Sequence, residues 1–94
     1  MLFHMSHSHT PENCPAHDAA RLKTLAEVMK SARERGINLR SLHLAPWEHT
    51  FYGILEAESA EDIERWLDPI LGLGMAKLTP VTDAMSSIGQ RLEG

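Results

Sequence analysis

The sequence predicts a single α+β domain that spans residues 1–94, and three features of the chain lead to this prediction. The chain has 94 residues, which suits one domain with one hydrophobic core. Its apolar fraction of 43% and its charged fraction of 23% are ordinary for a globular protein. Its segments alternate between the periods of strands and helices, in the order β-α-β-β-α-β with a short terminal helix.

An amphipathic helix is predicted between two strands in the first half of the chain. Residues 2–8 alternate loosely between apolar and polar side chains, which predicts a strand. A helix is expected over residues 18–35, because Asp18 is a suitable N-cap and Gly36 suits the position after the last turn. The apolar side chains of this helix recur at helical spacing and comprise Leu22, Leu25, Ala26, Met29 and Ala32.

The second half of the chain predicts a hairpin, a helix, a strand and a terminal helix. These elements are strands at residues 37–45, 49–57 and 75–81, a helix that begins at Ser59, and a short helix capped by Thr82 or Asp83. Pro46 begins the short connection between the first two of these strands, which are therefore expected to pair as an antiparallel hairpin. Trp66 is expected in the core, and Pro69 is expected to kink or loosen the last turn of its helix.

The element order predicts a ferredoxin-like fold, because right-handed crossovers place four antiparallel strands in the order 4-1-3-2 with two helices on one face. Phe51 and Leu55 are predicted on one face of the sheet. The apolar side chains predicted on the opposite face are Leu42, Leu44, Tyr52 and Ile54. A sheet that is apolar on both faces but has helices on only one implies a partner. We therefore expect a homodimer in which two sheets close into an α+β barrel, with Trp47 packed in an interface.

The second half of the chain resembles small dimeric α+β-barrel proteins of the GYD and DUF3303 kind. The resemblance lies in the run FYGILEAESAEDIERWLDPILGLGMAKLTPVTD. In it, the third strand ends at the acidic Glu56, the following helix has a central Trp66, and the fourth strand ends at Pro80-Val81. The Gly-Tyr-Asp turn of the GYD group would fall at residues 47–50, where this chain has Trp-Glu-His-Thr. The resemblance implies a dimeric barrel, and the wider superfamily includes cofactor-free monooxygenases, isomerases and haem-binding enzymes.

Four potential metal ligands fall within the segment HSHTPENCPAH, which contains His7, His9, Cys14 and His17. In the predicted topology, the end of the first strand lies beside the start of the third strand, where His49 is found. His7 and His9 project to the same face of their strand, about 6–7 Å apart at their Cα atoms, which suits two ligands of one ion. The predicted ligands are His7, His9 and His49, with Cys14, His17 and His43 as additional candidates.

The first functional hypothesis is a small dimeric protein that binds a transition metal. Imidazole nitrogen and thiolate sulfur favour Zn²⁺, Cu²⁺ or Ni²⁺ over Mg²⁺ or Ca²⁺. Four protein ligands would make such a site structural, whereas three ligands and a water would make it catalytic or sensory. A plainer interpretation stays open, with a solvent-facing His-x-His pair and Cys14 as a small buried anchor of its loop.

Two other functional hypotheses come from other parts of the chain. One is an enzyme of the barrel superfamily that acts on a small organic molecule. Its cavity would be lined by Leu42, Leu44, Tyr52 and Ile54. Glu56 is the candidate general base of this cavity, and Glu48 is a candidate base or hydrogen-bond acceptor beside His49. The other is a non-catalytic interaction module with an apolar patch on the terminal helix, formed by Met85, Ile88 and Leu92.

Charge, hydropathy and cysteine content narrow the range of partners and compartments. The formal net charge of −4 provides no basic footprint, so we expect no nucleic acid partner. No apolar run approaches the roughly 18 residues of a membrane span, so we expect no membrane insertion. The first residues lack the basic and continuous apolar regions of a signal peptide. A single cysteine precludes an intrachain disulfide, and a cytoplasmic location is therefore expected.

Overall fold

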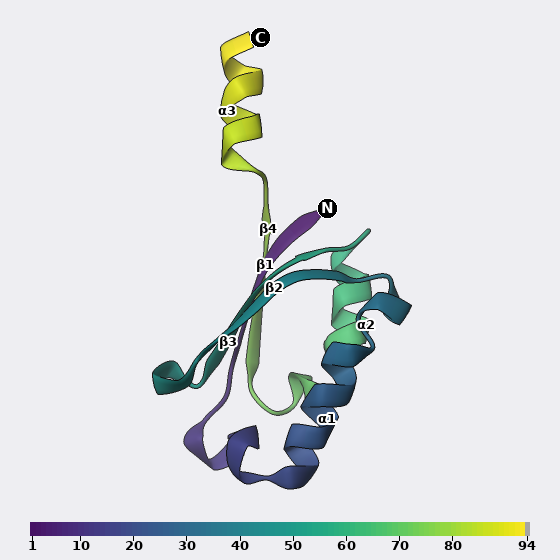
Figure 1. Cartoon of the computed structure of the whole chain (residues 1–94), viewed down its shortest axis with the longest axis vertical. Coiled ribbons are helices and arrows are strands. Elements are labelled where there is room, and N and C mark those ends of the chain that lie inside the picture. Colours follow the sequence, from purple (N-terminus) through teal and green to yellow (C-terminus); the bar gives the residue numbers. More distant parts are fainter. Residues whose placement is uncertain (94) are drawn as a thin grey trace.

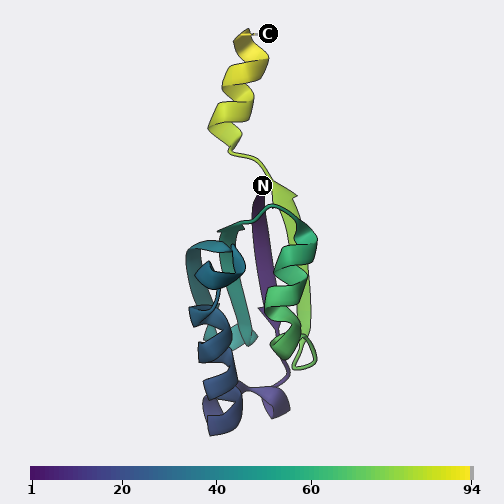
Figure 2. The same cartoon turned by 90° about the vertical axis from the view of Figure 1, so that its right-hand side faces the viewer.

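Two helices cover one face of a four-stranded sheet, and a third helix extends away from this body (Figures 1 and 2). The computed structural model describes residues 1–93. The strands are β1 (Leu2–Ser8), β2 (Asn38–Ala45), β3 (Thr50–Glu56) and β4 (Met75–Val81). The helices are α1 (Ala19–Lys30), α2 (Ala60–Leu71) and α3 (Ala84–Glu93). Short 3₁₀ turns are η1 (Pro11–Asn13), η2 (Pro15–His17), η3 (Arg33–Arg35) and η4 (Pro46–Glu48). The predicted element order is confirmed.

The four strands form one antiparallel sheet in the order β2-β3-β1-β4. This arrangement is the predicted 4-1-3-2 order, with α1 and α2 on the same side (Figure 2). The ferredoxin-like βαββαβ fold is therefore confirmed. In the register of the two central strands, Ser8 lies opposite Thr50 and Leu2 lies opposite Glu56. The end of β1 consequently meets the start of β3, as the metal hypothesis requires.

The predicted caps of both covering helices are present. The carboxylate of Asp18 accepts hydrogen bonds from the backbone N–H groups of Ala20 and Arg21 at the start of α1. The hydroxyl of Ser59 accepts a hydrogen bond from the backbone N–H of Asp62 at the start of α2. The first helix is shorter than predicted, because α1 ends at Lys30 and the chain continues as the 3₁₀ turn η3.

The hydrophobic core lies between the helices and the sheet. Its largest fully buried side chains are Phe3, Met5, Leu55, Ile63, Trp66 and Ile70. The indole Nε1 of Trp66 donates a hydrogen bond to the carbonyl oxygen of Val28 at 2.7 Å, which ties α2 to the last turn of α1. The prediction of Trp66 as a core residue is confirmed, since its side chain is 2% exposed. Burying each large apolar side chain stabilises the fold by about 1.5–3 kcal/mol before the loss of entropy.

The predicted faces of β2 are wrong. Leu42 and Leu44 lie opposite Gly53 and Phe51 of β3, so they share the helix-covered face with Phe51 rather than the open face with Tyr52. Leu42 packs against the core. The error is one of register, because residues 46–49 form the hairpin loop, and a change of one residue in loop length moves a whole strand to the other face.

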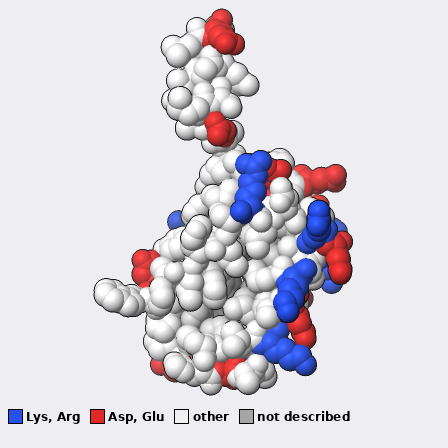
Figure 3. Space-filling view, viewed as in Figure 1, with Lys and Arg blue, Asp and Glu red and all other residues white. Residues whose placement is uncertain are grey.

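The open face of the sheet is consequently more polar than predicted. Alternation along the strands places on it Leu2, His4, Ser6, Ser41, His43, Tyr52, Ile54, Lys77, Thr79 and Val81. Two of the four apolar side chains that suggested a dimer therefore belong to the other face. The space-filling view shows acidic and basic side chains interspersed along one side of the body, with no continuous basic patch on the visible face (Figure 3). The homodimer stays a prediction.

Helix α3 projects from the end of β4 as an arm (Figure 1). The carboxylate of Asp83 accepts a hydrogen bond from the backbone N–H of Ser86 at 2.9 Å and so caps this helix, as predicted. Met85, Ile88 and Leu92 are all exposed along the arm. Among the described residues, no helix combines the length and the apolar character that crossing a membrane requires.

Candidate metal centre

Antiparallel pairing of β1 with β3 brings His9 and His49 together. The backbone N–H of His9 donates a hydrogen bond to the carbonyl oxygen of His49 at 3.0 Å. Their imidazole rings lie edge to face, with centroids 5.3 Å apart and an interplanar angle of 81°. Cys14 approaches the same point from the loop between η1 and η2. The potential ligand atoms of His9, Cys14 and His49 all lie within 4.8 Å of one another.

His9 is the buried member of this triad, and its hydrogen bonding is incomplete. Its side chain is 8% exposed, and among the described residues neither Nδ1 nor Nε2 has a hydrogen-bond partner. Leaving a buried polar group without a partner costs about 1–3 kcal/mol. Burial lowers the pKa of His9, and the charges of His49 and His7 lower it further. The neutral imidazole is therefore favoured, which is the form that binds a metal ion.

The donor set of the triad fits a late first-row transition ion. Two imidazoles and one thiolate are ligands that Zn²⁺ and copper accept. Ligand atoms bound to one tetrahedral ion lie about 3.3–3.6 Å apart, given metal–ligand bonds of about 2.0–2.3 Å. Side-chain rotations that shorten the longest separation by about 1 Å are sufficient to complete such a site. The unpartnered nitrogens of His9 support this fit, because a metal bond would satisfy one of them.

The backbone of His49 has a conformation that is uncommon for a residue with a side chain. Its φ of 51° and ψ of 42° lie in the left-handed region, where glycine is preferred and asparagine, aspartate and histidine are enriched among the other residues. The 3₁₀ turn η4 leads into it, and the backbone N–H of His49 donates to the carbonyl oxygen of Pro46. This turn places the ring of His49 against His9 rather than leaving it in solvent.

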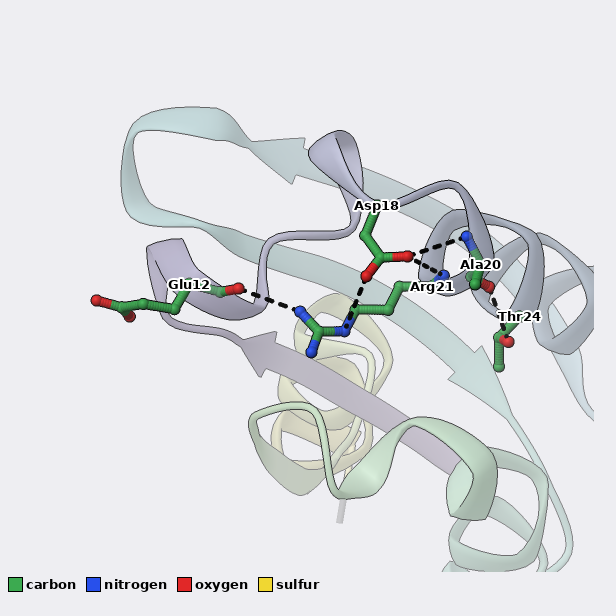
Figure 4. Close-up of polar contacts among 5 residues, drawn as sticks. All are labelled: Glu12, Asp18, Ala20, Arg21 and Thr24. Atoms are coloured by element: carbon green, nitrogen blue, oxygen red, sulfur yellow. Dashed lines mark hydrogen bonds and ion pairs between the residues drawn. The ribbon is translucent and has the colours of Figure 1, made fainter.

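A polar network holds the loop that carries Cys14 (Figure 4). The guanidinium of Arg21 donates to the carbonyl oxygen of Glu12 at 3.1 Å and lies 3.6 Å from the carboxylate of Asp18. The backbone N–H of Cys14 donates to the carbonyl oxygen of Pro11. The start of α1 and the preceding loop are thereby joined, and this junction fixes where the thiol of Cys14 lies.

Gly74 supports the site from the opposite side, a role that no pattern in the sequence indicates. A Cβ atom added at Gly74 would overlap the carbonyl oxygen of Ser8 and would lie 3.1 Å from Cα of His9. The turn between α2 and β4 therefore needs a glycine to pack against the end of β1. The nearest signal in the sequence is Gly72-Leu73-Gly74, which by itself predicts only the end of a helix.

The triad opens into a pocket of about 390 Å³. The remaining lining residues are Pro15, Ala16, His17, Leu22, Leu25, Leu44, Pro46 and Phe51. The pocket lies on the helix side of the sheet, where α1 and η2 face the start of β3. None of its lining residues is Asp, Glu, Lys or Arg. The predicted cavity on the open face, by contrast, shares only Leu44 with this pocket.

The other predicted metal ligands are not part of the triad. His7 lies on the same face as His9, as predicted; its Nε2 donates to the carbonyl oxygen of Ile70 at 3.1 Å, and its buried Nδ1 has no partner among the described residues. His17 is exposed at the wall of the pocket. His43 lies on the open face opposite Tyr52, because the register of β2 turns it away from the helices.

The two acidic candidates, Glu48 and Glu56, are not among the grouped ligand atoms, and each has another polar partner. Glu48 accepts a hydrogen bond from the hydroxyl of Tyr52 at 2.6 Å, and this contact raises the pKa of Tyr52. Glu56 forms an ion pair with Arg40 at the other end of the sheet from His9. Glu48 directly precedes His49 in the chain, but its carboxylate is paired with Tyr52.

Comparison with solved structures shows the fold. A protein from Streptomyces coelicolor A3(2) matches with a TM-score of 0.56 and 14% identity, covering 88% of this chain and 100% of that one. A protein from Deinococcus radiodurans, provisionally described as an antibiotic biosynthesis monooxygenase, matches with a TM-score of 0.48 and 13% identity over 88% of this chain and 93% of that one. No family model and no curated protein sequence matches the chain. Its assignment to the GYD and DUF3303 kind stays a prediction.

Proposed function

We propose that the protein binds one transition metal ion, Zn²⁺, Cu²⁺ or Ni²⁺, through His9, Cys14 and His49. The observation that carries the proposal is the buried ring of His9, whose two nitrogens lack partners among the described residues while a thiol and a second imidazole lie beside it. Solvation does not account for this arrangement, since the ring of His9 is covered. A metal ion satisfies the ring and uses the neutral form that burial favours.

Three protein ligands leave one coordination position free, and the pocket lies on that side of the triad. A site of this kind is catalytic or sensory rather than structural, because an exchangeable water or ligand occupies the fourth position. His7 supports the site without being one of the proposed ligands. Its bond to Ile70 fixes β1 against α2 just before His9.

The proposal also includes a homodimeric assembly, a cytoplasmic location and membership of the GYD and DUF3303 group. Tyr52, Ile54, Leu2 and Val81 give the open face an apolar part on which a second copy can pack, which makes a homodimer of the α+β-barrel kind. A thiolate ligand at Cys14 needs a reducing environment, which supports a cytoplasmic location. Membership of the GYD and DUF3303 group is proposed on the sequence resemblance alone.

A second candidate function is an enzyme that acts on a small organic molecule. The pocket beside the triad favours it, because an apolar cavity with a few convergent polar groups is the usual form of a small-molecule site. In that case, the metal ion and the pocket form one active site on the helix side. Glu56 would have no part in it, given its place at the opposite end of the sheet.

Titration with Co²⁺ tests the metal site directly. The metal-free protein, purified without an affinity tag and kept reduced, is expected to bind one Co²⁺ per chain and to develop the absorption of a cobalt–thiolate bond. Cys14→Ser is expected to abolish that absorption, and His9→Ala and His49→Asn to weaken binding at least about 100-fold. Asparagine is chosen at position 49 because it tolerates the left-handed backbone.

His43→Ala is the matched control, since it removes an imidazole from the open face of the same sheet. It is expected to bind Co²⁺ as the wild-type protein does. Absence of binding at micromolar Co²⁺, Zn²⁺, Cu²⁺ and Ni²⁺ would refute the proposed function. Equal losses in His43→Ala and His9→Ala would show that any metal bound is not held by this triad.

A further inference from the structure

We propose that the fourth position of the metal ion takes a small apolar molecule that carries a single metal-binding donor atom and no other charged group. This inference rests on the proposed metal site and names the class of ligand that the site accepts. It comes from the composition of the pocket, its size and its position relative to the triad. Each of these observations restricts a different property of the ligand.

The lining of the pocket excludes charged ligands. No acidic or basic side chain lines it, and apart from the triad its polar lining is limited to the exposed His17. A carboxylate, phosphate or ammonium group held against these walls, away from the metal ion, would lose its hydration and find no opposite charge. The walls are built by Leu22 and Leu25 of α1, by Leu44 of β2 and by Phe51 of β3. These side chains offer apolar contact on several sides.

The size of the pocket limits the ligand to a small molecule. Its volume of about 390 Å³ lies near the lower end of the range of about 300–1,000 Å³ that is typical of small-molecule sites. All three triad residues line the pocket, so an ion held by them borders this space. A ligand of one or two rings that fills the apolar part therefore has one atom directed to the metal. A soft or borderline donor, such as an aromatic nitrogen or a thiol, suits this class of ion.

Four small probes separate the parts of this inference. All four are titrated into the Zn²⁺-loaded protein. 4-Phenylimidazole carries a metal-binding nitrogen and an apolar ring, imidazole carries the nitrogen without the apolar ring, and ethylbenzene carries the apolar ring without a donor atom. The fourth probe is 4-(imidazol-4-yl)benzoate, which adds a carboxylate to the first. Calorimetric titration gives each affinity, and the zinc content after gel filtration shows that the metal stays bound. We expect 4-phenylimidazole to bind about tenfold or more tightly than imidazole, ethylbenzene and the benzoate.

A substitution in the pocket wall is expected to reduce the preference for 4-phenylimidazole over the benzoate. Leu44 is 53% exposed, so Leu44→Lys adds a cation at the rim with little effect on the core. We expect this variant to improve the affinity of the benzoate relative to 4-phenylimidazole by about tenfold. Leu92→Lys makes the same chemical change on α3, where the side chain is 83% exposed and lines no part of the pocket, and is expected to change nothing. Circular dichroism and zinc content confirm that both variants keep the fold and the metal site.

The outcomes distinguish this inference from the proposal on which it depends. Zinc binding without a preference for 4-phenylimidazole over imidazole would overturn the ligand class and leave the metal site standing. A benzoate that binds as well as 4-phenylimidazole would overturn the exclusion of charge. A protein that binds no zinc at all would overturn both proposals. The inference stands if the apolar probe is preferred and Leu44→Lys alone shifts that preference.

Discussion

The two faces of the sheet both carry histidines, and the environments of these histidines differ. His4 and His43 lie on the open face, where His43 is exposed and His4 is partly exposed. His7 and His9 lie on the helix-covered face of the same strand as His4, and both are buried. Alternation along a single strand is enough to separate the two groups. Face and burial, rather than the number of histidines, distinguish the residues of the proposed metal site.

The polar groups of the two faces differ in the same way. On the open face, Arg40 pairs with Glu56 and the hydroxyl of Tyr52 donates to Glu48, so each charged group has a partner or solvent. On the covered face, His9 has neither among the described residues. Natural proteins rarely keep a buried polar group unsatisfied without a functional reason. The covered face is therefore where the proposed metal ion would complete the bonding of a buried ring.

The largest difference between the two faces is expected in their contribution to stability. Trp66→Ala removes a fully buried indole and its bond to Val28, and is expected to lower the free energy of unfolding by about 3–5 kcal/mol. Tyr52→Ala on the open face is expected to cost less than about 1 kcal/mol in dilute protein. Urea unfolding at two protein concentrations measures both. Equal costs at the lower concentration would contradict the assignment of the core to the covered face.

The next largest effect on stability is expected from a substitution at Gly74, which packs closely against the backbone of His9. Gly74→Ala places a methyl group against the backbone of Ser8 and His9 and is expected to cost about 1–3 kcal/mol. The displaced strand end is also expected to weaken metal binding. Gly72→Ala is the matched control, because no atom lies within 4 Å of the position that its methyl group would take and its φ of −72° suits alanine. If the two variants have the same unfolding midpoint, the packing of Gly74 against β1 is not tight.

A stabilising substitution is expected at His9 itself. His9→Leu replaces an unsatisfied buried ring by an apolar side chain, and in the metal-free state it is expected to raise the free energy of unfolding by about 1–2 kcal/mol. His4→Leu, on the open face of the same strand, is expected to change it by less than about 0.5 kcal/mol. Urea unfolding in the presence of a chelator gives both values. Destabilisation by His9→Leu would mean that the ring has polar partners in solution.

The smallest expected effect concerns α3, which lies outside both faces. The bond from the backbone N–H of Ser86 lowers the pKa of the Asp83 carboxyl below its ordinary value of 3.8. The ionised cap therefore stabilises α3 above pH 3.8, and this contribution is lost as the pH falls through the lowered pKa. The amide resonance of Ser86 is expected to shift with that titration while resonances of the body do not. A shift centred above pH 3.8 would contradict the capping role.

The sequence predicted the fold well because its signals are local. Asp18 and Ser59 mark helix starts, and the element order leaves few topologies. The predicted topology also places His9 beside His49 correctly, because the end of one strand lies next to the start of its antiparallel neighbour. The faces of Leu42, Leu44 and His43 were not predictable in this way. They depend on the length of the hairpin loop, which sequence patterns give only to within a residue or two.

Two features of the site depend on tertiary packing, which spacing along the chain does not show. Cys14, one of the additional ligand candidates, lies on a loop that Arg21 ties to α1 through the carbonyl oxygen of Glu12, a contact between residues nine positions apart in the chain. The bond from Nε2 of His7 to the carbonyl oxygen of Ile70 depends likewise on how α2 packs over β1. Spacing along the chain makes His7 and His9 equivalent, whereas this contact occupies one ring nitrogen of His7 and leaves only its Nδ1 without a partner among the described residues.

X-ray absorption spectroscopy of the bound metal tests the central claim most directly. For the Zn²⁺-loaded protein, the claim predicts one sulfur at about 2.3 Å and two imidazole nitrogens at about 2.0–2.1 Å, with one further light ligand. His43→Ala is expected to give the same spectrum, and Cys14→Ser a spectrum without sulfur. A wild-type coordination shell that contains no sulfur, or one that is unchanged by Cys14→Ser, would contradict a metal centre formed by His9, Cys14 and His49.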